Sequence, residues 1–471
     1  MADSWVNPAE ILGADLHLEL TGGGSRRAAL MRALRDAIRT GRLAPGTRLP
    51  PYRSLAADLG IARNTVADAY AELVAEGWLT ARQGSGTRVA DRTEPTTPVR
   101  RPRTATPEHR PAYDLTQGRP DPSAFPRAAW LASARRALTA APHDTFGPGD
   151  PRGRPELREA LAEYLGRVRG VRTDPSRVVV CSGAAHALRL LARVVGGRWG
   201  VEEYGLPFHH ALLTDSGVRT VSLPVDEHGA DIALLRRERA VLLTPAHQFP
   251  TGGPLHAERR SALVDWARSS GGLVLEDDYD GEFRYDRRPV GAVQGLDPDR
   301  VVLMGSVSKS LSPTLRIGWM VLPPQLLDDV LAAKGEREQY SSATEQLTLA
   351  DFVRCGAYDR HVRRMRLRYR RRRDQLVALL AKRAPQVRVT GIAAGLHAVL
   401  ELPPGTERAV VKAAAWQGLA VEGLADFRRP GGGPGEAAGT RRDGLVVGYA
   451  TPPEHLYAGA LDALCRALPP A

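Results

Sequence analysis

The sequence Gly305-Ser306-Val307-Ser308-Lys309 places an amine behind two short hydroxyl groups, directly after an apolar run at 301–303. A lysine at the end of a strand is suited to forming a Schiff base, and serines at this spacing are suited to donating to a phosphate. Arg316, further along, can add a guanidinium to the same phosphate. This pattern is informative only together with other motifs of the same kind of site, because Ser-x-x-Lys also occurs around surface lysines.

A second group of chemically capable residues, Glu276-Asp277-Asp278-Tyr279-Asp280, follows the apolar run at 273–275. A carboxylate at the carboxyl end of a parallel strand can pair with a pyridine nitrogen and keep it protonated, so that the ring accepts electrons. Asp277 is the predicted carboxylate, and Tyr279 can donate to the phenolic oxygen of the same ring. The alternative interpretation is an acidic loop exposed to water.

Two further segments follow strand-like runs. Gly183-Ala184-Ala185 opens a helical stretch, where free backbone amides and the positive end of the helix dipole suit a phosphate. The segment 244–252 reads Thr-Pro-Ala-His-Gln-Phe-Pro-Thr-Gly, and we expect His247 to be among the polar groups that reach the cofactor ring. Together these patterns predict a site for pyridoxal 5'-phosphate.

The elements that must position these groups lie in residues 112–471, where continuous apolar runs alternate with helical stretches. This alternation predicts an α/β domain with a mainly parallel central sheet. The segment 91–111 is rich in Pro, Thr and Arg and has almost no large apolar residue, so we expect a linker there. The linker separates this domain from a smaller one at 15–90.

The segment 15–90 has a helical pattern that ends in a glycine-rich hairpin. The range 26–40 predicts an amphipathic helix. Ser54 is predicted to cap a short second helix that Gly60 closes, and the range 62–76 predicts a third. Two short helices joined through a glycine turn form a helix-turn-helix.

Polar residues begin the last of these helices, where a recognition helix meets base edges and phosphates: Arg63, Asn64 and Thr65. Short strands at 78–81 and 87–89 are expected to form a wing, with Arg82 and Arg88 as phosphate contacts. Double-stranded operator DNA is the predicted partner. A small helical domain without a ligand is the alternative.

Composition and charge indicate which partners and which cellular location are expected. The net charge of +12 fits a polyanionic partner, although a base-composition bias of the genome would also enrich arginine. The sequence has no run of eighteen apolar residues and no apolar signal core, so we expect a cytoplasmic protein without a membrane partner. Its three cysteines lack metal-ligand spacing, and no metal is expected. The basic run 363–373 favours a solvated or dimer-facing helix over a DNA contact.

The first segment resembles the GntR-type winged helix through Pro45-Gly46, Leu49-Pro50, Leu55-Ala56, Thr65-Val66, Ala69-Tyr70 and Glu76-Gly77. This resemblance implies that the DNA contacts are Arg53, Arg63, Thr65 and Gly84. The chain from about Leu16 onward is similar to the MocR/GabR family, in which a GntR-type domain is fused to a fold-type I aminotransferase-like domain. The similarity rests on Asp150-Pro151 with Gly153, the 244–252 run, Glu-Asp-Asp-Tyr-Asp, and Ser308-Lys309 through Arg316 to Gly318.

The family resemblance implies roles for single residues. Lys309 would form the internal aldimine with pyridoxal phosphate, Asp277 would pair with the pyridine nitrogen, and Tyr279 would bond the phenolic oxygen. The phosphate would be held by Ser306, Ser308 and Arg316. The resemblance also implies a homodimer, because fold-type I proteins build the cofactor site at a subunit interface.

The sequence departs from the family pattern in the second domain. Leu206 stands where an aromatic ring is expected to stack on the cofactor, with Phe208 as a substitute, and Val446 and Val447 offer no arginine for a substrate carboxylate. These changes favour a regulator that senses pyridoxal phosphate itself or an amino compound, without physiological turnover. The alternatives are an active class I/II aminotransferase with an appended DNA-binding domain, and a DNA-binding protein whose second domain has lost the cofactor.

Overall fold

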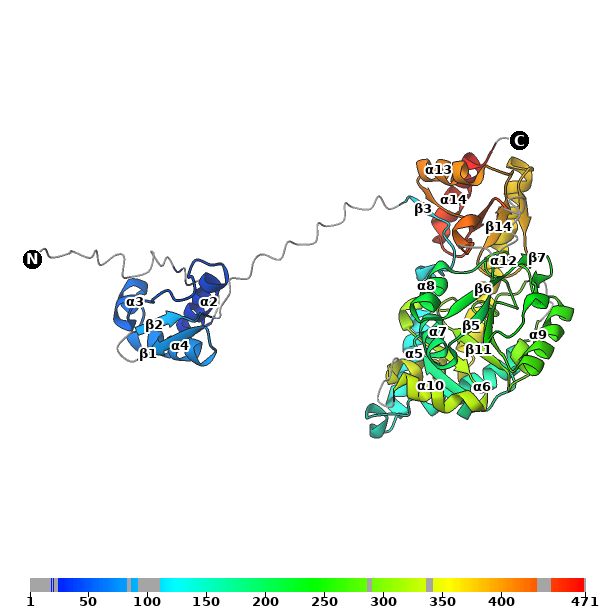
Figure 1. The fold of residues 1–471 in the computed structure, drawn as a ribbon. Coiled ribbons are helices and arrows are strands. Elements are labelled where there is room, and N and C mark those ends of the chain that lie inside the picture. Colours follow the sequence, from blue (N-terminus) through cyan, green and yellow to red (C-terminus); the bar gives the residue numbers. More distant parts are fainter. Residues whose placement is uncertain are drawn as a thin grey trace, which may run out of the picture. The chain divides into compact units, whose positions relative to one another are not determined.

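The structure is a computed structural model that describes residues 18, 20, 24–82, 86–91, 111–285, 290–335, 342–429 and 442–469. The chain divides into two compact units, Met1–Arg110 and Pro111–Ala471 (Figure 1). Most of the predicted linker at 91–111 lies outside the described residues.

The described residues of the first unit include helices α2 (Arg26–Arg39), α3 (Tyr52–Leu59) and α4 (Arg63–Ala75). The amphipathic pattern predicted for α2 is confirmed, because Leu30, Leu34 and Ile38 are buried on one side of the helix. They form a single core with the buried side chains of α4, which include Val66 and Leu73. That core holds α4 against α2.

The expectation that Ser54 caps the second helix is wrong. The helix α3 begins at Tyr52, and Pro51 stands at its N-cap position without a side-chain hydrogen bond. Pro51 has a φ of −57°, close to the angle that the proline ring fixes. The helix therefore starts about one turn earlier than it would if Ser54 were the N-cap residue. Gly60 closes α3 as predicted, in the left-handed conformation with a φ of 61°.

The wing is a two-stranded antiparallel hairpin of β1 (Leu79–Arg82) and β2 (Gly86–Val89). Leu79 pairs with Val89, and both side chains are buried in the core of the unit. The turn at 83–85, which includes the predicted DNA contact Gly84, lies outside the described residues.

The second unit is built around a seven-stranded sheet in the order β4-β12-β11-β10-β9-β5-β6. Its strands are β4 (Val178–Cys181), β5 (Arg198–Glu202), β6 (Arg219–Leu223), β9 (Ala240–Leu243), β10 (Leu273–Asp277), β11 (Val301–Ser306) and β12 (Gly318–Val321). Only β12 runs antiparallel to its neighbours within this sheet, so the predicted mainly parallel sheet is confirmed.

Both faces of this sheet are covered, because alternate residues of each strand point to opposite sides. On one side Val179 and Cys181 pack against helices α7 (Ala184–Val195), α8 (Pro207–Asp215) and α10 (Leu327–Lys334). On the other side Val178 and Val180 pack against α6 (Pro155–Arg169), α11 (Ala343–Arg354) and α12 (Ala357–Arg383). Helix α9 (Ala257–Ser270) covers β9 and β10 on that same side, and α5 (Arg127–Ala140) packs on α11.

A smaller antiparallel sheet completes the unit in the order β13-β14-β17-β16. Its strands are β13 (Arg388–Thr390), β14 (Ala398–Glu401), β16 (Glu422–Gly423) and β17 (Gly444–Val447), and the helices beside it are α13 (Glu407–Trp416) and α14 (Glu454–Ala467). The first strand of the unit, β3 (Tyr113–Asp114), pairs with β15 (Leu419–Ala420), and β7 (Val225–Asp226) pairs with β8 (Gly229–Ala230). The N-terminal end of the unit is therefore attached to its C-terminal part.

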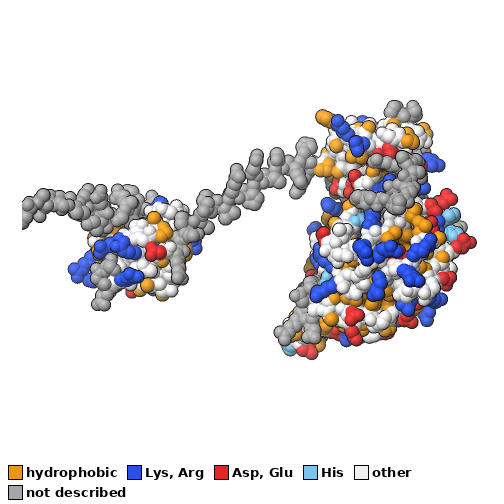
Figure 2. All heavy atoms as spheres, in the orientation of Figure 1, with side chains coloured by type: hydrophobic (Ala, Val, Ile, Leu, Met, Phe, Trp, Pro, Cys, Tyr) orange, Lys and Arg blue, Asp and Glu red, His pale blue; other side chains and the backbone are white. Residues whose placement is uncertain are grey.

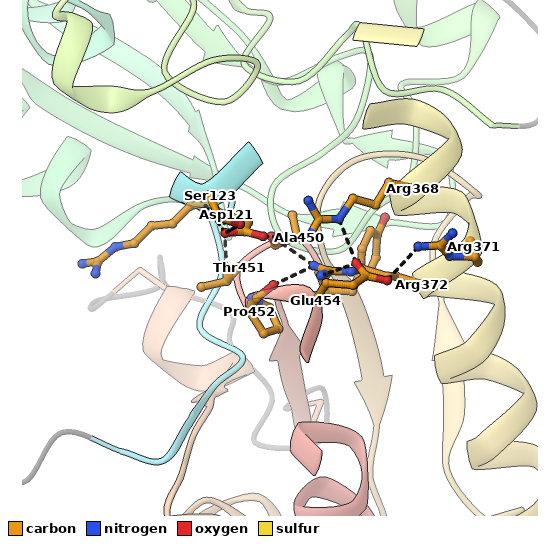
Figure 3. Close-up of polar contacts among 11 residues, drawn as sticks. Asp121, Ser123, Arg368, Arg371, Arg372, Ala450, Thr451, Pro452 and Glu454 are labelled. Atoms are coloured by element: carbon orange, nitrogen blue, oxygen red, sulfur yellow. Dashed lines mark hydrogen bonds and ion pairs between the residues drawn. The ribbon is translucent and has the colours of Figure 1, made fainter. Parts of the chain in front are cut away.

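Arginines of the basic run on α12 form ion pairs with both the N-terminal and the C-terminal parts of the second unit. Arg368, Arg371 and Arg372 all reach the carboxylate of Glu454 at the start of α14, and Arg368 also pairs with Asp121 (Figure 3). The Arg372 side chain is completely buried and donates to backbone carbonyls at 449 and 452. A solvated or dimer-facing position, which the sequence favoured for this run, is therefore wrong for Arg372. No helix among the described residues is both long and apolar enough to span a membrane.

Candidate functional site

The predicted chemical groups meet at the carboxyl ends of β10 and β11. These strands are parallel neighbours in which Asp277 pairs with Met304, so the loops that follow them leave the sheet at the same edge. A cavity of about 690 Å³ opens there. Nine of the ten predicted cofactor contacts line it: Gly183, Ala184, Ala185, Asp277, Tyr279, Ser306, Ser308, Lys309 and Arg316.

Lys309 extends across this cavity, and its Nζ donates a hydrogen bond to the carbonyl oxygen of Gly118. Burial lowers the pKa of the Lys309 ammonium, an effect that Asp277 and Asp280 oppose and Arg119 reinforces. A lowered pKa makes more of the neutral amine available, which is the form that attacks an aldehyde.

Gly118 is a site residue that sequence reasoning missed. Its φ of +85° is a conformation that L side chains rarely adopt, and a Cβ placed on it would lie 2.7 Å from Lys309 Nζ. A larger residue would strain the backbone here and would displace the end of the Lys309 side chain. The signal in the sequence was a lone glycine before Arg119-Pro120, more than 180 residues away from the lysine.

Asp277 lies at the floor of the cavity with only 7% of its surface exposed. Burial, followed by the charge of Asp278, raises the pKa of its carboxyl to about 7, while Lys309 acts in the opposite direction. A second buried carboxyl, Glu202 at the end of β5, has its pKa raised to about 7 mainly by burial. Its Oε2 accepts hydrogen bonds from the hydroxyl and the amide of Thr244, at 2.6 and 3.1 Å.

Tyr279 lines the cavity, and the structure places His247 behind it. The Tyr279 hydroxyl lies 2.9 Å from Nδ1 of His247, and the same nitrogen lies 2.8 Å from Oδ2 of Asp280. His247 is buried and is absent from the described lining of the cavity. His247 thus orients Tyr279, and its predicted direct reach to the cofactor ring remains a prediction.

A cluster of small polar groups lies at the end of the cavity beside β11. Ser306 Oγ donates to Ser308 Oγ at 2.7 Å, and the Ser308 amide donates to Ser306 Oγ at 3.0 Å. Arg316 has a φ of 53°, the only positive value among the described non-glycine residues, and its side chain lines the same cavity. Gly183, with a φ of 115°, is the N-cap residue of α7, and Ala184 and Ala185 in the first turn of that helix also line the cavity.

The cavity is also lined by residues that sequence reasoning did not select: Gln117, Arg119, Tyr204, His209, Phe249, Glu422, Asp426 and Phe427. Leu206 and Phe208 also line it, and 51% of the Phe208 surface is exposed. These residues come from four separate stretches of the chain, and no local motif connects them.

The predicted DNA contacts of the first unit lie on its surface. Arg53 is exposed on α3, and Arg63 and Asn64 are exposed in the first turn of α4, while Thr65 is half-buried. Arg82 is exposed at the end of β1, next to the tip of the wing. Arginine side chains gather on one edge of this unit in Figure 2.

Two family models match the chain. The model described as bacterial regulatory proteins of the gntR family matches residues 27–89, and the model for aminotransferase class I and II matches residues 113–432. The pyridoxine biosynthesis transcriptional regulator PdxR of Corynebacterium glutamicum is 34% identical over 90% of this chain and 91% of its own. The probable rhizopine catabolism regulatory protein MocR of Rhizobium meliloti is 35% identical over 89% of each chain.

Solved structures match the second unit. An archaeal alanine:glyoxylate aminotransferase has a TM-score of 0.67 at 24% identity, covering 76% of this chain and 90% of its own. The α-aminoadipate aminotransferase LysN of Thermus thermophilus, complexed with N-(5'-phosphopyridoxyl)-L-leucine, has a TM-score of 0.66 at 25% identity, covering 75% and 91%. Both have the fold of class I and II aminotransferases.

These findings define a DNA-binding transcription regulator with an aminotransferase-like domain. The chain belongs to the MocR-type family, in which a GntR-type winged helix precedes a fold-type I aminotransferase domain.

Proposed function

We propose that this regulator holds pyridoxal 5'-phosphate on Lys309 and changes its affinity for operator DNA when the cavity is occupied. The signal would be the cofactor itself or an amino compound that joins it there. One observation carries the proposal: Lys309 and the buried Asp277 line the same cavity as Ser306, Ser308 and Arg316, on the same chain as a winged helix.

The residues present fit pyridoxal phosphate in each of its parts. Lys309 supplies the amine, Asp277 a carboxyl for the ring nitrogen, and Tyr279 a hydroxyl for the phenolic oxygen. For the phosphate, Ser306, Ser308, Arg316 and the amides of Ala184 and Ala185 offer donors at the start of a helix. Bound there, the cofactor supplies an electron-accepting ring and an aldehyde that bonds to amines.

The side chains at this site have different roles. Burial favours the neutral amine of Lys309, which can attack an aldehyde carbon. The negative charge of Asp280 beside His247 keeps the Tyr279 hydroxyl in one orientation. The aromatic rings of Tyr204, Phe249 and Phe427 form a buried apolar cluster that lines the cavity and would limit the water in it.

Sensing is favoured over turnover because a transaminase must hold the carboxylate of its substrate firmly. The described strand β17 reads Gly-Leu-Val-Val and offers no arginine for that purpose. The name of the Corynebacterium relative refers to pyridoxine biosynthesis, which supports vitamin B6 metabolism as one possible target. Amino-acid metabolism is the other.

The DNA contacts we propose are Arg53, Arg63, Asn64, Thr65, Arg82 and Gly84. A homodimer would present two winged helices to paired half-sites and would complete each cofactor site at the subunit interface. The domain limits that go with this function are 15–90, 91–111 and 112–471. Operator binding places the protein in the cytoplasm, where the DNA is.

The test combines absorption with DNA binding. Protein loaded with pyridoxal phosphate should have a visible absorption band that Lys309→Ala removes, and its affinity for the operator upstream of a neighbouring gene should differ from that of the cofactor-free protein. A band that Lys309→Ala leaves unchanged contradicts the assignment of Lys309. Conversion of an amino donor to a keto acid at ordinary enzyme rates would favour an aminotransferase with an appended DNA-binding domain.

A further inference from the structure

Lys309 lies in the turn 307–311 between β11 and β12, so the regular hydrogen bonding of a strand or helix does not fix its backbone. Apolar burial holds both ends of this turn, since Val307 and Leu311 belong to the main core of the unit. The residue directly after the lysine is different, because Ser310 is polar and only 3% exposed. Buried polar groups need hydrogen-bond partners, and helix α12 supplies them to both the hydroxyl and the carbonyl of Ser310.

The side chain of Ser310 is bonded to Tyr358, which lies in the first turn of α12. The two hydroxyl oxygens are 2.8 Å apart, and the Tyr358 hydroxyl also lies 3.0 Å from Oε1 of Glu282. A hydroxyl donates one proton and accepts at its lone pairs, so Tyr358 can bond both groups at once. Its buried ring packs against Tyr164 and Phe352, with centroid distances of 5.2 and 6.4 Å. The Ser310 side chain is therefore held by a group that packing itself keeps in place.

The carbonyl of Ser310 is bonded to His361, one turn further along α12. His361 Nε2 lies 2.8 Å from the carbonyl oxygen, and its Nδ1 lies 3.1 Å from Nη2 of Arg364. A guanidinium can only donate, so Nδ1 accepts and the ring proton is on Nε2, which donates to Ser310. Burial lowers the pKa of the imidazole to about 4, an effect that the bond to Ser310 opposes and Arg364 reinforces. His361 is thus a neutral donor with a fixed tautomer.

The same helix also holds the loop that follows β10. Nε and Nη2 of Arg366 donate to the carbonyl oxygen of Glu282, at 3.0 and 2.6 Å, and the carboxyl of Glu282 is the second partner of Tyr358. Helix α12 therefore contacts both the turn that carries Lys309 and the loop that begins after Asp277. These contacts help to set the position of the amine relative to the carboxyl across the cavity.

We propose that Tyr358 and His361 are positioning residues for Lys309, which act through Ser310 to hold the amine where it meets the aldehyde of the cofactor. This inference rests on the proposed function, in which Lys309 holds pyridoxal phosphate. Neither Tyr358 nor His361 is part of the described cavity lining, so they act on the lysine and not on the ligand. Capture joins the amine nitrogen to the aldehyde carbon and releases the aldehyde oxygen with both amine hydrogens as water. A displacement of about 1 Å at such a reacting atom can slow a reaction about 100-fold.

The experiment adds pyridoxal phosphate to cofactor-free, full-length protein and follows the visible band by stopped-flow absorption. Tyr358→Phe removes one hydroxyl and keeps the ring, and we expect it to slow capture about tenfold, the size of one lost hydrogen bond. His361→Leu should slow capture to a similar extent. His361→Gln, whose amide can donate to the Ser310 carbonyl, should restore most of the rate.

The circular dichroism of the visible band supplies a second measurement, because it depends on a fixed orientation of the bound ring. We expect this signal to fall in Tyr358→Phe and His361→Leu and to recover in His361→Gln. A variant that is merely less stable would keep the signal of the molecules that remain folded. Loss of stability alone therefore predicts an unchanged signal per bound cofactor, which would overturn the proposal.

A double-variant cycle tests the route through Ser310. Ser310→Ala should slow capture by itself, without disturbing the packing of the Tyr358 ring. The double variant Ser310→Ala with Tyr358→Phe should be no slower than the slower of the two single variants, because both changes remove the same bond. Independent, multiplied losses in the double variant would show that Tyr358 does not act through Ser310, and would overturn the proposal.

Tyr164→Phe is the matched control. It removes the hydroxyl of the ring that packs edge-on against Tyr358, and none of the described hydrogen bonds joins Tyr164 to Ser310. It should capture the cofactor at the wild-type rate, and equal slowing in Tyr164→Phe and Tyr358→Phe would indicate a packing effect and overturn the proposal. If thermal unfolding shows that Tyr358→Phe is not folded, Ser310→Ala and the two His361 variants decide the question.

The same measurements separate this inference from the proposed function. A wild-type protein that develops no visible band contradicts the assignment of pyridoxal phosphate to Lys309. A wild-type protein that develops the band, with capture as fast in Ser310→Ala and His361→Leu as in wild type, overturns the positioning role alone.

Discussion

The Nζ atom of Lys309 donates a hydrogen bond to the carbonyl oxygen of Gly118, 191 residues earlier in the chain. The amine that is proposed to hold the cofactor is thus paired with the backbone of the segment 116–121. Bonding of Lys309 to an aldehyde would take this donor away from Gly118. Occupation of the site would therefore be coupled to the conformation of that segment.

Gly118→Ala tests this contact. The substitution places a methyl group 2.7 Å from Lys309 Nζ in a backbone conformation unfavourable to alanine, so the lysine must move. We expect the affinity for pyridoxal phosphate, measured from the visible band, to fall about tenfold or more. Gly217→Ala is the control, since Gly217 also has a positive φ of +77° but has nothing within 4 Å of its added Cβ. Equal losses of cofactor affinity in both variants would show that the contact between Gly118 and Lys309 is not the cause.

Glu202→Gln should change how stability depends on pH. The pKa of Glu202 is raised from 4.5 to about 7 by burial, so the folded state favours the protonated form. The stability this contributes is present below about pH 4.5 and is lost as the pH rises through about 7. Cofactor-free Glu202→Gln lacks that loss of stability. Its free energy of unfolding should therefore rise by a few kcal/mol relative to wild type between pH 5 and about 8.

Denaturant unfolding at a series of pH values measures this difference. Glu163→Gln, an exposed position on α6, serves as the control and should follow the wild-type curve. A constant difference between Glu202→Gln and wild type across the whole range would show that the Glu202 carboxyl does not titrate as the burial implies.

Arg372→Leu should destabilise the second unit far more than Arg371→Leu. Arg372 is completely buried, and its loss leaves the carbonyls at 449 and 452 without their donor (Figure 3). We expect a loss of about 3 kcal/mol or more, against less than about 1 kcal/mol for the exposed Arg371. Thermal unfolding measures both. Operator affinity that falls steeply in Arg371→Leu would instead assign part of this helix to DNA.

Arg63→Ala should weaken operator binding about 10- to 100-fold, because an arginine at the start of a recognition helix reads base edges. The side chain is exposed, so the stability of the first unit should not change. Arg27→Ala removes an equal charge from α2, where Arg27 pairs with Glu72, and should have a much smaller effect. Gel-shift titrations at fixed salt measure both, and equal losses would indicate a purely electrostatic role for Arg63.

The sequence allowed the second unit to be predicted wherever a side chain directly follows a buried strand. Asp277 and Lys309 are of this kind, because the direction of the parallel strands brings their loops to one edge. Gly118, His209 and Glu422 could not be predicted from the sequence, since they enter the cavity from a loop, a helix and the second sheet. Their positions depend on long-range packing, which leaves no periodic signal. The error at Ser54 was local, because the proline before the helix outweighed the serine within it.

The pairing of β3 with β15 has a mechanical consequence. The chain enters the second unit at Pro111, is fixed by β3, and three residues beyond that strand already forms the cavity wall at Gln117. Thr451 then pins the backbone on both sides of Gly118 through the carbonyls of Thr116 and Arg119. The point where the chain enters the second unit and the wall of the cavity are thus one short piece of backbone. A ligand that shifts this wall would therefore act directly on the N-terminal entry of the unit.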